Sequence, residues 1–295
     1  MTKTLTTPTP ATTRPKRRPK TLRSPMVLGA SIILVLFVIA GIFGNILIPY
    51  DGVNTSLTDR LLPPGGQLSG GGVALLGTDQ LGRDMLAQIV AGSRVSLTVA
   101  FATIAIAGAV GLVLGVTSGF FGGKWDALIS RLGDIQLAFP SILLAILLAG
   151  VLGPSLVNVI LALAITRWVI FARVVRASAL STRHLDFVDS ARVLGASNTR
   201  ILLKYIVPSC WQPLIVAATV QVGLTMVAEA SLSFLGLGVP LSDASWGATI
   251  ANGRDHLASA WWIATLPGLA LALVVVCVGI LGDAFRDHSD LLKNG

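Results

Sequence analysis

Charged residues make up only 12% of this 295-residue chain, 22 Lys and Arg against 14 Asp and Glu, whereas an ordinary soluble domain has about 25%. Hydrophobic residues make up 53%, and 31 glycines add to the apolar content. So little charge cannot cover a water-facing surface, which argues against a soluble enzyme, a disordered chain and a disulfide scaffold. The composition therefore predicts a protein that lies mostly in a lipid bilayer.

The net charge of +8 comes almost entirely from the first 25 residues, which hold seven basic residues and no acidic one. We expect residues 1–25 to form a disordered basic tail, because Thr and Pro dominate the segment and it cannot bury enough apolar surface to fold alone. Near a membrane such a tail meets anionic headgroups, at about 1 kcal/mol per basic residue. The basic excess thus calls for a lipid partner and not for nucleic acid.

The uncharged stretches predict an all-α polytopic membrane protein with six transmembrane helices, since about 20 apolar residues span a bilayer. The first is too long for a signal peptide and is read as a retained anchor. Gly153 and Pro154 separate the third span from the fourth. The predicted spans are 26–48, 95–123, 135–152, 155–174, 205–228 and 257–282.

Orientation follows from the basic residues, which favour the cytoplasmic side. With the N-terminus inside, the inner segments hold sixteen basic residues and the outer ones three. Both termini are therefore predicted in the cytoplasm. Arg167 and Arg173 fall at the end of the fourth span, where their side chains can snorkel to the headgroups. The remaining predicted segments are an extracytoplasmic loop at 49–92, a core of five spans at 93–283 with a cytoplasmic loop at 175–204, and a cytoplasmic tail at 284–295.

Glycines recur every fourth residue in the second predicted span. Small residues at this spacing let helix backbones approach closely in lipid. The repeat favours packing inside the chain, with a subunit interface as the alternative. The residues concerned are Gly111, Gly115, Gly119 and Gly123.

Catalytic and metal-binding patterns are missing from the sequence. Lys124 follows two glycines but lacks the rest of a phosphate-binding loop. The three histidines lack the spacing of metal ligands. Cys210 and Cys277 lie in apolar stretches and are read as buried hydrophobic residues. We therefore expect no enzyme activity, no metal and no cofactor in this chain, and an energy source elsewhere.

The cytoplasmic loop has the pattern of a short amphipathic helix. Phe187, Ala191 and Leu194 fall at i, i+4 and i+7, on one helical face. Gly195 is placed to end this helix, because glycine adopts the left-handed cap conformation without steric cost. Ser197 or Asn198 could cap the next helix. An apolar helical face inside a loop suits docking into a groove of a partner.

This loop resembles the EAA loop of ABC importer permeases, with Asp189-Ser190-Ala191 in place of Glu-Ala-Ala and with Gly195 and Pro208 at the family spacing. Other segments are similar to the C-type subunits of dipeptide and oligopeptide permeases. Two triplet positions and the outer stretch 240–244 depart from the family pattern. The segments are Gly77-Thr-Asp-Gln-Leu-Gly-Arg-Asp84, Glu229-Ala-Ser-Leu-Ser-Phe-Leu-Gly-Leu-Gly238 and Leu281-Gly-Asp-Ala-Phe-Arg-Asp287.

The resemblance implies a type I importer permease in a bacterial cytoplasmic (inner) membrane. It implies a heterodimer with a second permease, two cytoplasmic ATPases that carry ATP and Mg²⁺, and an extracytoplasmic binding protein. Short peptides are the implied substrates, while nickel chelates and other small solutes stay open. The implied coupling helix, which docks on an ATPase, comprises Phe187, Val188, Asp189, Ser190, Ala191, Arg192, Leu194 and Gly195, with Pro208 ending the loop.

Glu229 is the only glutamate and follows 24 uncharged residues. An ionisable group at membrane depth points to a functional site, so Glu229 and Phe234 are candidates for the translocation path or a gate. Arg94 is a possible ion-pair partner. The alternative is a satisfied acid at a helix break near the outer face. A secondary transporter or an intramembrane enzyme fits less well, because neither an inverted repeat nor a catalytic constellation is evident.

Overall fold

The computed structural model describes residues 24–48, 55–240 and 243–294, so almost all of the predicted tail at 1–25 lies outside the described residues. Nearly all of the ordered elements are helical, which confirms the predicted all-α fold. The elements are α1 (Pro25–Leu47), η1 (Leu57–Asp59), β1 (Gly66–Gln67), β2 (Val73–Ala74), α2 (Met85–Phe121), α3 (Gly123–Leu137), α4 (Ser141–Leu152), α5 (Leu156–Thr182), α6 (Asp186–Val193), α7 (Asn198–Ile201), η2 (Leu202–Ile206), α8 (Val207–Phe234), α9 (Trp246–Gly253), η3 (Arg254–His256) and α10 (Trp262–Asn294).

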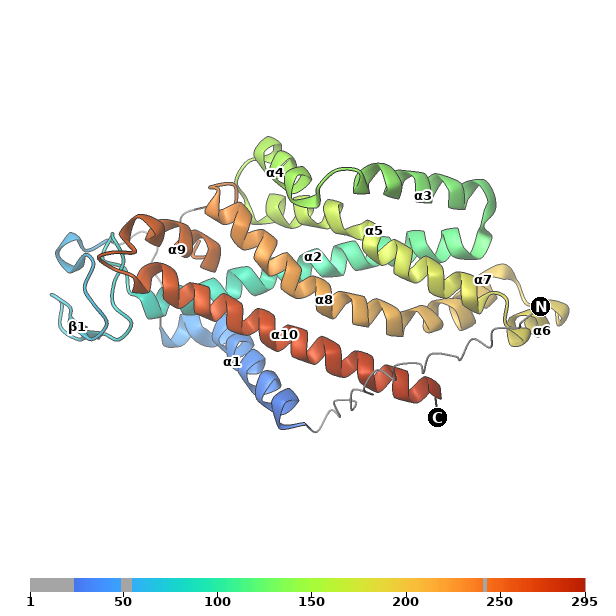
Figure 1. Ribbon diagram of the computed structural model, residues 1–295, viewed down its shortest axis with the longest axis horizontal. Helices are drawn as coiled ribbons and strands as arrows, with labels where there is room; N and C mark the ends of the chain where they lie inside the picture. The colour runs from blue at the N-terminus through green and yellow to red at the C-terminus, as the bar shows by residue number, and fades with distance from the viewer. Residues whose placement is uncertain (1–23, 49–54, 241–242, 295) are drawn as a thin grey trace, which may run out of the picture.

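Four long helices, α2, α5, α8 and α10, run along the length of the molecule, and α1 crosses beside them (Figure 1). The small β1–β2 hairpin and α9 lie at one end, and α6 and α7 lie at the other. Within the described ranges, five helical segments are long and apolar enough to cross a membrane, and the bent pair α3–α4 makes a sixth if it counts as one span. This arrangement fits the six predicted spans.

The third predicted span, 135–152, is not one straight helix. It is divided between α3 and α4, whose axes differ by 87°. The break falls at Pro140, because a proline disfavours helical geometry in the residue before it. The segment 124–134, between the second and third predicted spans, is helical, since α3 covers it. The boundary at 152–155 is confirmed, because α4 ends at Leu152 and α5 begins at Leu156.

Several helices extend well beyond the uncharged stretches used to predict them. α2 begins at Met85, inside the predicted outer loop, where the carboxylate of Asp84 accepts a hydrogen bond from the Ala87 amide at 2.9 Å. Its 37 residues span about 55 Å, more than the ~30 Å hydrocarbon core. α5 continues to Thr182 and α10 continues to Asn294, so both helices extend into segments that were predicted to lie outside the membrane. Helices that project from the bilayer can include charged residues.

The glycine repeat packs α2 closely against α5. A Cβ atom built on Gly111 would lie 2.4 Å from the Cβ of Phe171, one on Gly115 would lie 2.6 Å from the carbonyl oxygen of Ala172, and one on Gly119 would lie 2.8 Å from the Cβ of Ala179. Packing inside the chain is therefore confirmed for these three glycines. The assignment is wrong for Gly123, whose Cβ would meet nothing within 4 Å. Gly123 has φ +61° and is the first residue of α3, beyond the contact between α2 and α5.

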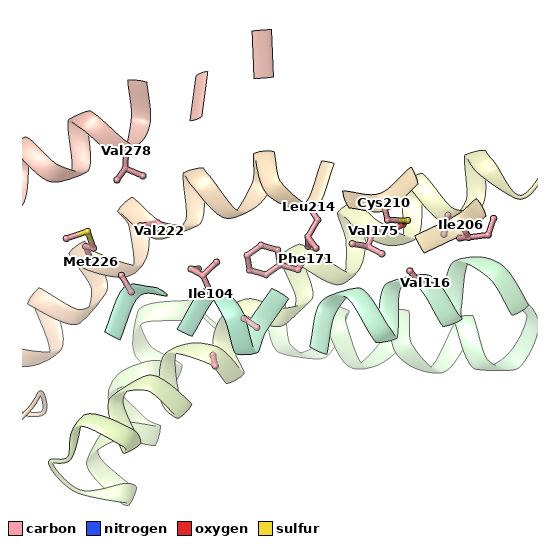
Figure 2. Close-up of a cluster of buried hydrophobic side chains, with 14 of the residues drawn as sticks. Ile104, Val116, Phe171, Val175, Ile206, Cys210, Leu214, Val222, Met226 and Val278 are labelled. Carbon is pink, nitrogen blue, oxygen red and sulfur yellow. The ribbon is translucent and has the colours of Figure 1, made fainter. Parts of the chain in front are cut away.

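The main core lies between α2, α5 and α8, with α10 at its edge. Figure 2 shows its side chains, among them Ile104 from α2, Phe171 and Val175 from α5, and Met226 from α8. Cys210 belongs to this cluster, and both cysteines are free and buried, as expected. The same cluster continues to Val188 and Ala191 of α6. The cytoplasmic helix is therefore joined to the packing of the membrane bundle.

Candidate functional site

The short helix α6 (Asp186–Val193) lies at one end of the bundle, after α5. Val188 is fully buried and Ala191 is 7% exposed, both packed into the main core. The prediction that these two side chains contact a partner's groove is therefore wrong, because the chain itself covers them. Val193, 89% exposed, and Leu194, 86% exposed, form the free apolar surface, with Phe187 half exposed beside them.

The end of α6 is determined by Gly195, as predicted. Gly195 has φ +81°, and its amide donates to the carbonyl of Arg192 at 2.9 Å. The Ala196 amide donates to the carbonyl of Ala191 at 3.0 Å, which completes a Schellman motif. The Ser197 hydroxyl then accepts from the Arg200 amide and caps α7, which decides between the two predicted caps. These bonds fix the direction in which the chain leaves α6.

The seat of α6 consists of α7, η2 and the start of α8. The ring of Phe187 lies 5.6 Å from the ring of Tyr205, measured between centroids. Ile201 and Ile206, both fully buried, belong to the same cluster as Val188. Pro208 lies in the first turn of α8, where its missing amide hydrogen costs least. α6 is therefore tied to a membrane helix through packed side chains and not only through the chain.

The polar side of α6 carries an exposed ion pair between Asp189 and Arg192, with 3.0 Å between Oδ1 and Nη1. A shallow groove of about 490 Å³ lies along this side, lined by Asp186, Asp189, Ser190, Val193 and Leu194. An exposed pair at i and i+3 contributes only about 0.3–0.5 kcal/mol to stability. Both side chains of this ion pair are exposed, so a partner protein can reach them.

At the opposite end, the Gly-Thr-Asp segment builds a compact cap at the start of α2. The Asp79 carboxylate accepts from the Arg83 side chain at 2.7 Å and from Gln88 Nε2 at 3.0 Å, and all three side chains are buried. Gly77 has φ +82°, and a Cβ there would lie 2.8 Å from Trp262 Nε1. The motif therefore has a structural role: it joins the outer loop to α2 and α10.

Asp59 organises the rest of this cap. Its carboxylate accepts from the Ser69 amide at 2.8 Å, from the Ser56 hydroxyl at 2.7 Å and from the Ser69 hydroxyl at 2.9 Å. These bonds, the Ser69 amide first, hold the pKa of Asp59 below its ordinary value. The Asp59 backbone carbonyl accepts from the Thr78 hydroxyl at 2.5 Å, which connects η1 to the Gly-Thr-Asp segment.

Glu229 lies near the outer end of α8 and is fully buried. Its carboxylate accepts from the Ser96 hydroxyl at 3.2 Å and from the Ser233 hydroxyl at 2.8 Å. The Ser245 hydroxyl donates to Ser233 Oγ at 3.3 Å, so α2, α8 and the N-terminus of α9 meet at this acid. Arg94, the predicted partner, is exposed, and Glu229 forms no ion pair with it among the described residues. The structure thus favours the satisfied-acid interpretation, and the acid itself lines no open path.

An open pocket of about 740 Å³ lies next to this cluster at the outer end. Ser233 and Phe234 from α8 line it together with Ala248 and Asn252 from α9. Phe234 is 39% exposed, and the Arg254 guanidinium lies 5.7 Å from the centre of its ring. Phe234, but not Glu229, therefore faces a space large enough for a small solute.

A polar contact between the middle of α5 and the middle of α8 was missed by the sequence reasoning. Arg167 lies in the middle of α5 and is held there by hydrogen bonds to α8. Its Nη1 donates to Gln221 Oε1 of α8 at 2.6 Å, and its Nη2 donates to the Leu224 carbonyl at 3.0 Å. The signal available in the sequence was Arg167 itself, a charged residue only thirteen positions after Pro154.

Residues 111–291, more than half of the chain, match the family model described as the binding-protein-dependent transport system inner membrane component. The chain belongs to this family.

Relatives of this permease carry names from the peptide and nickel transport systems. The chain is 38% identical over 269 residues to the di/tripeptide transport system permease of Pseudomonas aeruginosa, covering 90% of this chain and 88% of that protein. It is 38% identical over 272 residues to the probable D,D-dipeptide transport system permease of Escherichia coli, covering 92% and 89%. The nickel transport system permease of E. coli is 37% identical over 265 residues, covering 88% and 92%.

Membership places this permease, as a multi-pass protein, in a bacterial inner membrane, as part of a binding-protein-dependent ABC transporter. Its exposed features lie at opposite ends of the bundle: α6 with Val193 and Leu194 at one end, and the pocket beside Phe234 at the other. Val193 and the serines around Glu229 are further residues that the pattern analysis did not identify.

Proposed function

We propose that this permease forms a heterodimer with a second permease and imports short peptides released by an extracytoplasmic binding protein. Two cytoplasmic ATPases, which carry ATP and Mg²⁺, would drive the transport. The names of the similar permeases support peptides as the substrate class. The nickel system permease is almost as similar, so a metal chelate is the competing substrate.

The observation that supports the coupling mechanism is that α6 has one buried apolar face and one exposed apolar face. Val188 and Ala191 pack one face of α6 into the main core, and Val193 and Leu194 are exposed at the other face. Two exposed large apolar side chains at a helix end suit insertion into a partner's groove. In this proposal the ATPase holds the free face, and the buried face transmits its movement to α8.

A rigid lever requires a connection that does not bend when force is applied. The Schellman motif at Gly195 and the Ser197 cap fix the chain direction. Arg183 adds a second connection, because its Nη1 donates to the carbonyl of Gly119 at the end of α2, at 2.9 Å. A movement of α6 would therefore reach α2 and α8 together. Asp189 and Arg192 are the proposed polar contacts at the rim of the groove.

The test replaces Leu194 with Asp in the complete transporter. The expected result is loss of the ATPases on copurification and loss of peptide import, while the variant still inserts and pairs with the second permease. Thr199→Asp is the matched control, because Thr199 is exposed at the start of α7 and an acid is favourable at a helix N-terminus. Normal import with Leu194→Asp would show that α6 does not dock as proposed.

Import assays in proteoliposomes then decide the substrate class. The wild-type complex with its binding protein is expected to accumulate a labelled dipeptide or tripeptide in the presence of ATP. Accumulation of a nickel chelate without any peptide import would refute the peptide assignment and leave the permease role unchanged.

A further inference from the structure

A permanent cation lies at mid-depth in the bundle. Arg167 comes 11 residues after the start of α5 and 15 residues before its end, which places it about 16 Å and 22 Å from the two ends at 1.5 Å per residue. Gln221, which accepts its hydrogen bond, lies near the middle of α8. Neither end of α5 is therefore within easy reach of the Arg167 side chain.

The contacts of this guanidinium leave its charge uncompensated. Its two hydrogen-bond acceptors, the Gln221 amide oxygen and the Leu224 carbonyl oxygen, are neutral. Its Nε atom is buried without a hydrogen-bond partner. In the part of the chain that the structure describes, no carboxylate forms an ion pair with it. A cation at membrane depth normally pairs with an acid or faces water, because lipid cannot solvate it.

The surface around Arg167 is open on one side. The bond to the Leu224 carbonyl is exposed, and the Leu224 side chain is 52% exposed on the same part of α8. An arginine within a membrane-spanning segment almost always faces the bundle interior or a water-filled cavity and not lipid. For the open side of Arg167, this leaves the aqueous path or the second permease.

We propose that Arg167 binds the C-terminal carboxylate of the peptide as it passes through the permease, which rests on the peptide import proposed above. The planar guanidinium matches a carboxylate through parallel N–H donors. The Gln221 oxygen and the Leu224 carbonyl orient the group without neutralising it, so its charge stays available. The site is a specificity contact: it favours solutes that carry a free carboxylate.

Import by the complete transporter in proteoliposomes tests this site with two substrates, a tripeptide with a free C-terminus and the same tripeptide as its C-terminal amide. The binding protein is supplied at equal occupancy for both, as measured by calorimetry. The variants are Arg167→Gln, which removes the charge, and Arg167→Lys, which keeps the charge but loses the planar fork. Arg173→Gln is the matched control, because Arg173 lies on the same helix, is exposed and pairs with Asp134.

The expected result is a fall of about tenfold in the acid-to-amide import ratio for Arg167→Gln, equivalent to about 1.4 kcal/mol. A smaller fall is expected for Arg167→Lys, and no change for Arg173→Gln. An equal loss for both peptides would overturn the proposal and make Arg167 a tether between α5 and α8. If Arg167→Gln fails to pair with the second permease while Arg167→Lys pairs and keeps the wild-type ratio, the carboxylate belongs to that subunit and the proposal also fails. Absence of peptide import in the wild type would instead refute the proposed function.

Discussion

Replacing Gly115 with Ala should separate the two most closely packed helices of the bundle. The new Cβ would lie 2.6 Å from the Ala172 carbonyl oxygen and 2.8 Å from the Cβ of Val175. Ordinary contacts begin near 3.4 Å, so α2 and α5 would have to move apart by roughly 0.8 Å, and overpacking of this kind costs about 1–3 kcal/mol. Alanine also favours a helix by up to about 1 kcal/mol over glycine. We therefore expect a net destabilisation of about 1–2 kcal/mol.

Gly108 provides the matched control for this substitution. It lies in the same helix, and a Cβ there would meet nothing within 4 Å. Gly108→Ala should therefore be neutral or stabilising by up to about 1 kcal/mol. Both variants can be compared with the wild type by equilibrium unfolding in mixed micelles, with tryptophan fluorescence as the signal. Equal stability of Gly115→Ala and Gly108→Ala would refute the close approach of α2 and α5.

Substitutions at three other residues, Asp84, Asp59 and Glu229, test the end of the bundle opposite α6. Asp84→Ala removes the cap of α2 and should cost about 1 kcal/mol in the same unfolding assay, whereas Asp84→Ser should restore most of it. Because the pKa of Asp59 is lowered in the folded protein, its stabilising effect is complete above the ordinary Asp value and is lost as pH falls through the folded value. The protection of the Ser69 amide against hydrogen exchange, relative to the intrinsic exchange rate at each pH, should therefore fall on acidification, and Asp59→Asn should remove that pH dependence. Glu229→Leu leaves two buried serine hydroxyls without their acceptor, which should lower the free energy of unfolding by about 1–3 kcal/mol. Abundance of the protein in the membrane and import should therefore fall together. Loss of import at normal abundance would contradict a structural role for Glu229.

The cytoplasmic helix shows what local sequence can and cannot predict. Gly195 and Ser197 were identified as caps because their effects depend on backbone geometry within a few residues. Which apolar face is buried was not predictable, since Phe187 with Leu194 and Val188 with Ala191 both occur at helical spacing. The second pair is the buried one because Val188 and Ala191 belong to the same core cluster as Ile206 of η2. The choice depends on contacts with residues further along the chain.

Span boundaries were the other source of error, because charge was used to end each helix. Charged residues end the apolar stretch but not the helix, as the extension of α5 to Thr182 shows. As a result, Arg167 was assigned to the end of a span although it lies in the middle of α5, and its contact with Gln221 was not predicted. Pro140, in contrast, was visible in the sequence, and the bend between α3 and α4 could have been predicted from it.

One helix, α8, connects the three regions for which functions are proposed above. α8 begins at the seat of α6, carries Gln221 at mid-depth and ends at Glu229 and Ser233 beside the outer pocket. Because Ser233 of α8 lines the pocket and Glu229 of α8 bonds to Ser96 of α2, a shift of α8 relative to α2 changes the pocket and that bond at once. Alternating access needs an element whose two positions expose different ends of the path. α8 packs against the proposed coupling helix α6 at one end and is bonded to α2 through Glu229 at the other, so it is suited to be that element. Arg167 lies on the neighbouring helix α5, between these two ends.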